Sequence, residues 1–246
     1  MTALAHKGAR RADRFAFVPG VHGPAALPKS TAAAAKSTEP KSTETDIGPL
    51  ASIASPVGFA PGAPIMREGD PAEHLFRIVS GVVKVCRTLA DGRCQITGFL
   101  FAGDFLGLVP EDVYLSSATA IGAVTVSRFP RKKVEQLVAL SPLVARLLLR
   151  RACSELIAAQ DQMLLLGRKS ATEKVASFLM MISRRTQGDA LDLPVTRADM
   201  ADYLGLTIET VSRTLTQLRV DGVIGVKRAK IRIVRRGALE DLAEAA

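Results

Sequence analysis

The sequence predicts an α+β fold in which an antiparallel β-roll is followed by a long helix and a C-terminal winged helix-turn-helix. Short β-rich runs, separated by Gly and Pro, occupy residues 57–130. Apolar residues then recur at helical spacing from residue 142 to about residue 166. Residues 195–234 contain two short amphipathic segments that flank a glycine, and a basic hairpin pattern follows them. These three patterns set the expected order of the elements.

The first fifty residues have the composition of a flexible tail. They are rich in Ala, Ser, Thr, Lys and Pro, and few large apolar side chains follow Phe17. Such a segment cannot bury enough surface to offset the entropy lost on ordering. Arginines at positions 10, 11 and 14 leave open a basic arm that contacts DNA or another protein. We therefore expect four regions, which are a tail (1–50), a roll (51–130), a helical region (131–168) and a C-terminal domain (169–246).

The roll is predicted from short strand candidates between turn signals. The strand candidates are residues 75–79, 82–87, 94–99 and 118–129. Glycines that mark turns lie before the first candidate, at position 69, and between the candidates, at positions 81, 92 and 103. Several short strands at this spacing favour a closed antiparallel roll or jelly roll.

The C-terminal pattern has the signals of two capped helices. Thr196 and Asp199 have the spacing of a capping box, and Gly205 supplies the turn after the first helix. Thr207 can cap the second helix. The second helix should pack inward through an apolar stripe that consists of Ile208, Val211, Leu215 and Leu218.

The opposite face of the second helix carries polar side chains at helical offsets, which are Glu209, Ser212, Arg213 and Thr216. A Glu can accept a hydrogen bond from cytosine N4, an Arg can bind guanine O6 and N7 in bidentate fashion, and a Ser can reach a base edge or a phosphate. This face is therefore predicted to enter the major groove of double-stranded DNA. The alternative is an ordinary solvated helix face.

A basic turn at residues 227–230 is predicted to form the wing. Lys227, Arg228 and Lys230 are suited to phosphate contacts, and a charged turn without a partner is the alternative. We assign further backbone or supporting contacts to threonines on the two helices, which are Thr196, Thr207, Thr210 and Thr216.

Charge and hydropathy are consistent with a partner that is a polyanion. The formal net charge is +9, and the pI is about 9.8. Composition alone does not separate DNA from RNA or anionic lipid. No apolar run in the sequence is long enough to span a bilayer, and the N-terminus has no apolar signal core. We therefore expect a cytoplasmic protein without a membrane partner.

Three segments resemble the Crp/Fnr superfamily of bacterial transcription regulators, and more narrowly its FixK/Fnr-like branch. They read DYLGLTIETVSRTLTQL, LLLGRKSATEKVASFLMMISRR and GFLFAGDFLGL, and the resemblance covers roughly residues 60–235. It implies a cyclic-nucleotide-binding-domain-like jelly roll and an E-x-x-S-R pattern that reads the TTGAT half of an inverted repeat. Carried over by position, Glu209, Ser212 and Arg213 would make the base contacts.

The resemblance also implies a mode of action. The expected protein is an activator that binds a TTGAT-N4-ATCAA-like palindrome and recruits RNA polymerase. The 91–93 tip contacts the polymerase in some relatives, but we interpret it here as a hairpin turn. The sequence shows no nucleophile–base pair, metal-ligand cluster or phosphate-cradling Gly loop, so an enzyme is not expected.

Cyclic-nucleotide-binding members of the superfamily have a Glu soon after the G-D-F-x-G segment and an Arg-Ser or Arg-Thr pair about ten residues later. Here Leu108, Val109 and Pro110 follow Gly107, and residues 114–119 stand where the Arg pair would lie. No Arg occurs between Arg93 and Arg128. Because a buried phosphate needs a cationic partner, we do not expect cyclic-nucleotide binding.

Other cofactors are also not expected. An iron–sulfur cluster held by four thiolates is excluded because the chain has three cysteines, at positions 86, 94 and 153. Of the three histidines, only His74 lies outside the expected tail, and we interpret it as a surface or hydrogen-bonded residue. The cysteines are expected to be buried or semi-buried thiols, although Cys86 and Cys94 could face each other across a hairpin. A regulator without a ligand is the leading hypothesis, and the alternative is a regulator gated by haem-bound gas, redox state or a nucleotide.

The long helix is predicted to make a homodimer. Its apolar surface is broad enough to cover the roll on one side and a second copy on the other. We assign the interface to Leu148, Ala152, Leu156, Ile157 and Met163. Two-fold symmetry would place two reading helices about one DNA turn apart. The alternative is a helix without a dimer contact.

Overall fold

The computed structural model describes residues 47–191, 195–227 and 230–245, which all belong to one unit that spans residues 41–246. Most of the expected tail falls outside the described residues. A 3-10 helix, η1 (Gly48–Ile53), nevertheless begins within its last part. Ile47 and Leu50 are buried against Phe129 and the helices that follow the roll. Residues 47–50 of the expected tail therefore belong to the packed structure, because an apolar residue at every third position packs there.

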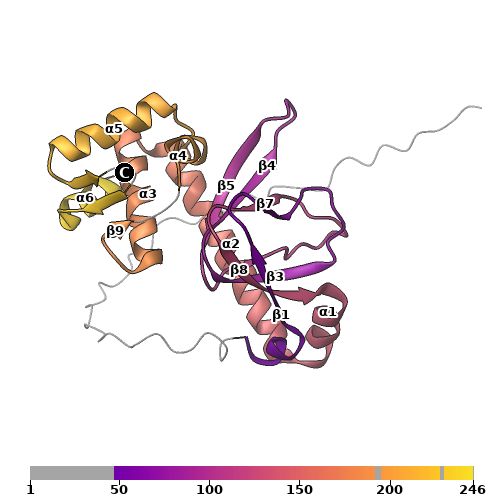
Figure 1. The fold of residues 1–246 in the computed structure, drawn as a ribbon. Helices are drawn as coiled ribbons and strands as arrows, with labels where there is room; N and C mark the ends of the chain where they lie inside the picture. Colours follow the sequence, from indigo (N-terminus) through magenta and orange to yellow (C-terminus); the bar gives the residue numbers. More distant parts are fainter. Residues whose placement is uncertain (1–46, 192–194, 228–229, 246) are drawn as a thin grey trace, which may run out of the picture. The chain divides into compact units, whose positions relative to one another are not determined.

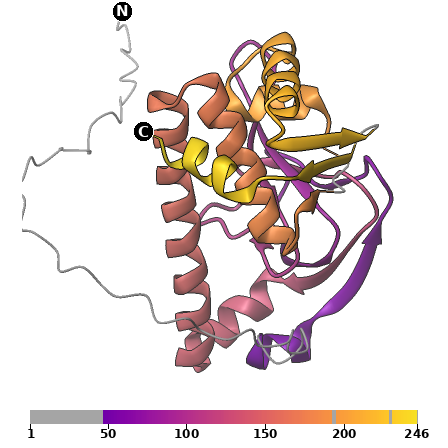
Figure 2. The same cartoon turned by 90° about the vertical axis from the view of Figure 1, so that its left-hand side faces the viewer.

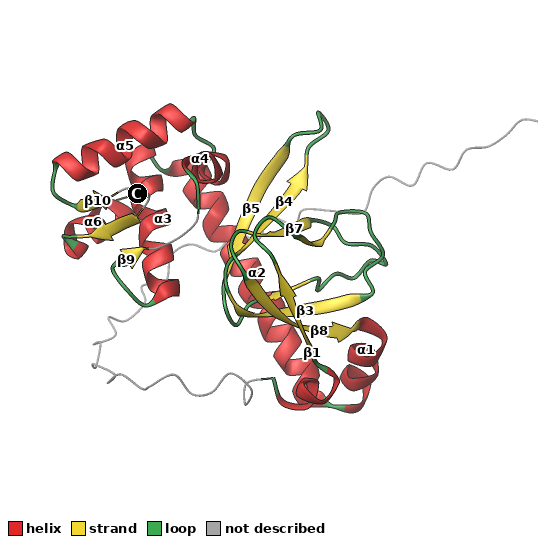
Figure 3. Ribbon diagram, in the orientation of Figure 1, coloured by secondary structure: helices red, strands yellow, loops and turns green. Residues whose placement is uncertain are grey.

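Two antiparallel four-stranded sheets form the roll, as Figures 1 and 3 show. The first has the order β1 (Ser55–Phe59), β8 (Val124–Pro130), β3 (His74–Ser80) and β6 (Phe105–Leu106). The second has the order β2 (Pro64–Met66), β7 (Ser117–Ala120), β4 (Val83–Thr88) and β5 (Cys94–Leu100). One apolar cluster includes Ile78 and Val126 from the first sheet and Val83 and Ala118 from the second. The predicted antiparallel roll is confirmed.

The strand candidates differ from the observed strands in two respects. The run 118–129 is divided into β7 and β8, and a bend at residues 121–123 carries the chain from one sheet to the other. The turn before β4 is tight, since Gly81 has φ +90° and a Cβ there would lie 2.4 Å from the Ala123 carbonyl oxygen. Strands β1, β2 and β6 were not predicted, because they are short and β1 and β2 contain Pro.

Two helices follow the roll. Helix α1 (Arg131–Leu140) lies in the expected helical region, and α2 (Pro142–Arg168) begins where predicted and ends two residues later than residue 166. Ser141 is extended between them, and Pro142 occupies the first turn of α2, where a missing N–H does no harm. Val144 and Leu148 anchor the start of α2 to the roll, in a cluster with Leu75 and Phe129.

The C-terminal part contains a helix-turn-helix and a small sheet, in the predicted order. Its elements are α3 (Ala171–Thr186), β9 (Ala190–Leu191), α4 (Arg197–Leu204), α5 (Ile208–Val220), β10 (Ile224–Lys227), β11 (Lys230–Ile233) and α6 (Arg236–Glu244). Helix α6 packs against α3 (Figure 2), and Arg236 donates a 2.7 Å hydrogen bond to the Ser183 hydroxyl. Across the described residues, none of the helices is both long and apolar enough to cross a bilayer.

Candidate nucleic-acid interface

Helix α4 begins at the predicted capping box. The Thr196 hydroxyl oxygen accepts from the Asp199 backbone N–H at 3.0 Å, and the Asp199 carboxylate accepts from the Thr196 backbone N–H at 3.1 Å. The helix ends at Gly205, whose φ of 60° is the left-handed conformation that glycine adopts without strain. The chain can therefore turn sharply from α4 into α5.

Helix α5 is capped by Thr207, whose hydroxyl oxygen accepts from the Thr210 N–H at 3.2 Å. Val211, Leu215 and Leu218 are buried as predicted. Ile208 was wrongly placed in this stripe, because 48% of its surface is exposed. It is the first residue of the helix and lies before the segment that packs on the core, so the apolar stripe starts only at Val211.

The predicted reading residues share one face of α5, which we call the recognition face and define as Glu209, Ser212, Arg213 and Thr216. Glu209, Arg213 and Thr216 are exposed, and Ser212 is partly buried. The Arg213 guanidinium lies 3.5 Å from the Thr210 hydroxyl oxygen, which keeps it close to the start of the helix. An acidic, a hydroxyl and a guanidinium group are thus presented together.

The structure adds Arg197 to this face, which the sequence did not indicate. Its Nη1 donates a 3.3 Å hydrogen bond to the Ser212 hydroxyl oxygen. Arg197 belongs to α4 and Ser212 to α5, so helical spacing within one segment cannot reveal the pair. The geometry of the Gly205 turn brings the two side chains together.

The wing is formed by β10 and β11, in which Lys227 and Lys230 lie opposite each other in the strand register. Both lysines are exposed. Arg228, the third predicted phosphate contact, lies outside the described residues. The described part of the wing therefore presents two cations at the end of the hairpin.

The other side of α4 is held by the roll. Lys84 Nζ lies 2.7 Å from an Asp199 carboxylate oxygen, and the Ile96 backbone N–H donates to the Asp202 carboxylate at 3.0 Å. Burial alone would raise the pKa of the Asp199 carboxyl, but hydrogen bonds from Lys84 and Thr196 hold that pKa below its usual value. Asp199, which completes the capping box of α4, is therefore also the partner of Lys84 on β4.

Comparison with known proteins agrees with this geometry. A family model described as a Crp-like helix-turn-helix domain matches residues 173–242, and one described as a cyclic nucleotide-binding domain matches residues 56–141. The nitrogen fixation regulation protein FixK of Bradyrhizobium diazoefficiens is 40% identical over 194 residues, which cover 77% of this chain and 82% of that protein. The chain belongs to the Crp/Fnr family. It is accordingly a DNA-binding transcription regulator of the FixK-like type.

Two further relatives support this Crp/Fnr assignment. The transcriptional activatory protein AadR of Rhodopseudomonas palustris is 40% identical, over 78% of this chain and 83% of that protein. The solved structure of FixK2 from Bradyrhizobium japonicum has a TM-score of 0.75 and 39% identity, and the match covers 79% of this chain and 99% of that one. The likeness therefore includes both the roll and the helix-turn-helix.

In this Crp/Fnr roll, the segment after Gly107 makes internal contacts. Leu108 packs on the cluster around Phe129. The Tyr114 hydroxyl donates to the His74 carbonyl at 2.8 Å, and burial raises the pKa of Tyr114. The Ser117 hydroxyl oxygen accepts from the Glu68 backbone N–H at 3.0 Å. Leu108, Tyr114 and Ser117 thus make contacts within the roll.

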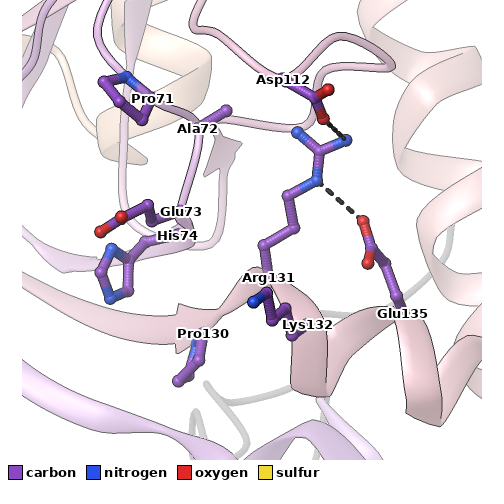
Figure 4. A pocket seen from close by; sticks show the side chains of 9 residues that line it. All are labelled: Pro71, Ala72, Glu73, His74, Asp112, Pro130, Arg131, Lys132 and Glu135. Atoms are coloured by element: carbon purple, nitrogen blue, oxygen red, sulfur yellow. Dashed lines mark hydrogen bonds and ion pairs between the residues drawn. The ribbon is translucent and has the colours of Figure 1, made fainter.

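A surface hollow of about 470 Å³ lies beside α1 (Figure 4). Arg131 projects into it, but its Nε lies 2.8 Å from the Glu135 carboxylate, and it also donates to the Glu111 carbonyl. Asp112 approaches the same guanidinium at 3.9 Å. Desolvation, together with the nearby Arg128 cation, lowers the pKa of His74, which also lines the hollow. The guanidinium is already balanced by carboxylates, so the hollow does not resemble an anion site.

Helix α2 leaves an apolar strip in solvent. Ala152, Leu156, Ile157 and Met163, four of the five predicted interface residues, are exposed. Leu148 was wrongly assigned to the interface, since it is 8% exposed and packs with Leu75 and Phe129 in the roll cluster. Leu149 and Leu164, which were not assigned, are 65% and 63% exposed on the same helix. The helix thus covers the roll near its start and presents apolar side chains farther along.

The structure contradicts the expectation that the cysteines are buried or semi-buried thiols. Cys86 and Cys94 form a disulfide across the β4–β5 hairpin, with their Cα atoms 5.9 Å apart. Cys153 is an exposed thiol on α2. The sequence left open that Cys86 and Cys94 face each other across a hairpin. The structure brings them together and adds a bond between them that was not expected. Within the part of the chain that the structure describes, His, Cys, Asp and Glu side chains form no cluster of three that could hold a metal.

Proposed function

We propose that the chain acts as a homodimer that binds a TTGAT-N4-ATCAA-like inverted repeat and activates transcription by recruiting RNA polymerase. The observation that carries this proposal is the recognition face of α5, where Glu209, Ser212 and Arg213 stand together beside a basic wing. Glu and Arg at these positions can distinguish base pairs in the major groove. FixK is named as a regulation protein and AadR as a transcriptional activatory protein, and the name of AadR supports activation.

The other polar residues would fix the register of the protein on DNA. We assign phosphate or supporting contacts to Lys227, Arg228 and Lys230 in the wing and to Thr196, Thr207, Thr210 and Thr216 on the helices. Thr196, Thr207 and Thr216 already bond within the protein. Their first role is therefore to hold the helix ends and the recognition face in place.

Dimerisation would use the apolar strip of α2. Leu156, Ile157 and Met163 are each 59–65% exposed, which is costly for a single copy in water. Packing two such strips about a two-fold axis would bury them and set the distance between two recognition faces. This is the geometric reason to expect a palindromic operator.

We further propose that operator binding needs no bound cofactor or cyclic nucleotide. Leu108, Tyr114 and Ser117 are engaged within the roll, and the segment between Arg93 and Arg128 supplies no Arg for a phosphate. A monoanion in that position would be left without a cationic partner. A second candidate, regulation by redox state, is favoured by the Cys86–Cys94 bond.

Quantitative footprinting on a TTGAT-N4-ATCAA duplex tests this proposal, with and without added cyclic AMP. We expect protection of both half-sites, with the same midpoint in the two conditions. Protection of one half-site alone would contradict the dimer, and protection only with cyclic AMP would contradict operation without a ligand. A Soret band in the purified protein would contradict the absence of haem.

A further inference from the structure

The β4–β5 hairpin contacts α4 through polar groups that we call the hairpin latch, which consists of Lys84, Gln95, Ile96, Asp199 and Asp202. Lys84 Nζ pairs with Asp199 at 2.7 Å. The Ile96 N–H donates to the Asp202 carboxylate at 3.0 Å, and the Gln95 side-chain amide donates to the Asp202 carbonyl oxygen. The latch therefore contacts α4 at two places, which are the capping-box residue Asp199 and the last turn of the helix, at Asp202.

The disulfide lies within the latch. Cys86 is two residues after Lys84, and Cys94 directly precedes Gln95. In the strand register, Cys86 is opposite Ile96, which also packs in the core that contains α4 and α5. The bond thus joins the two strands at the place where each supplies a contact to α4.

The hairpin is restrained differently along its length. Strand β4 pairs with β7 only from Val83 to Cys86, and Phe99 of β5 packs on Phe178 and Tyr203. Strand β5 is at the edge of its sheet and pairs only with β4 among the described strands. The pairing also shifts register between Val85 and Cys86. The outer end of the hairpin, which carries Gln95, depends mainly on this edge ladder, so a covalent cross-link there adds local order.

We propose that Cys86 and Cys94 form a reversible thiol–disulfide switch that controls how firmly the hairpin latch holds α4. In oxidation the two thiols lose two protons and pass two electrons to a peroxide or a small-molecule disulfide, and one S–S bond forms. A dithiol reductant reverses the step and restores both thiols. Cys94 is exposed and offers the sulfur that a small molecule can attack, whereas Cys86 is 7% exposed.

The consequence for DNA rests on the proposed function. Two recognition faces must be held at a fixed separation to engage both half-sites. If α4 and α5 are mobile before binding, the free energy needed to order them lowers the affinity for DNA. The disulfide form, with the latch closed, is therefore the form that binds the operator more tightly. Disulfides in proteins that work in a reducing compartment are usually transient or redox-sensing, which fits a switch better than a permanent brace.

The experiment uses the full chain carrying Cys153→Ser, so that only the pair responds. One sample is oxidised with glutathione disulfide and another is reduced with dithiothreitol, and mass spectrometry confirms each state. Hydrogen exchange of the amides in α4 and operator binding are then measured. We expect faster exchange in α4 after reduction and a fall in operator affinity of about fivefold or more.

Cys94→Ser in the same background should behave like the reduced sample under both treatments. The matched control is Arg185→Gln, which breaks the contact between Arg185 and Asp104, a contact outside the hairpin, and should keep the redox response. Equal α4 exchange in the two redox states would overturn the switch, as would tighter operator binding by the reduced protein. If neither state bound the operator, the proposed function would fail, and the exchange measurement would still decide on the latch.

Discussion

Lys84 on β4 and Asp199 at the start of α4 form an ion pair across 2.7 Å. The Asp199 carboxylate therefore both completes the capping box of α4 and joins this helix to the roll. The two side chains are 30% and 14% exposed, which places the pair at the margin of the protein interior. Such a pair is worth more than an open surface pair but less than a fully buried one. The ion pair therefore connects the roll directly to α4, the first helix of the helix-turn-helix.

Replacing Lys84 with Met should lower the free energy of unfolding by about 1 kcal/mol at pH 7, because Asp199 loses its charged partner. The lowered pKa of Asp199 means that this stability is present above the ordinary value of 3.8 and is lost as the pH falls through the lower folded-state pKa. Urea unfolding of wild type and Lys84→Met at pH 7 and pH 3 measures the effect. A difference that stays the same at both pH values would contradict the ion-pair account.

Arg213→Ala should lower operator affinity by about 1–3 kcal/mol and relax the preference at one base position, because a bidentate base contact is lost. Lys227→Ala should instead weaken binding to operator and random duplex alike, because a phosphate contact carries no sequence information. Titrations of both variants against both duplexes separate the roles. Equal losses for the two variants on both duplexes would show that Arg213 does not read a base.

If the chain is the proposed homodimer, Leu156→Glu or Ile157→Glu should convert it to monomer, since either change would place a charge between two apolar strips. Sedimentation equilibrium measures the change, and operator affinity should fall with it. Leu89→Glu is a suitable control, because Leu89 is also a partly exposed leucine, 41% exposed, but lies in the β4–β5 hairpin. An unchanged dimer in the α2 variants would place the interface elsewhere.

Leu148→Ala should act differently from the variants farther along α2. Its side chain is buried with Leu75 and Phe129, so truncation creates a cavity and should cost about 2–5 kcal/mol of unfolding free energy. Dimer dissociation measured under native conditions should change little. A variant that dissociated without losing stability would restore Leu148 to the interface.

The sequence predicted the helices well because their boundaries depend on local signals. Helix α2 begins at Pro142 as predicted, and the capping box of Thr196 and Asp199 forms as expected. Both depend on residues that are close in the chain. Glu209, Ser212 and Arg213 share a face for the same reason, because helical spacing alone places them there.

The failures concern contacts between distant segments. The periodicity of α2 could not tell that Leu148 faces the roll while Leu156 faces solvent. The approach of Arg197 to Ser212 depends on the turn at Gly205, and the latch depends on a hairpin more than a hundred residues away. The division of residues 118–129 into two strands likewise follows from pairing with different sheets.

Sequence reading by the recognition face of α5 is tested by the ratio of two affinities, one for the TTGAT-N4-ATCAA duplex and one for a scrambled duplex of equal composition. Fluorescence anisotropy at moderate salt measures both. We expect the inverted repeat to bind about a thousandfold or more tightly, with two chains per duplex. Equal affinity for the two duplexes would show that the recognition face of α5 does not read sequence, and would contradict the account.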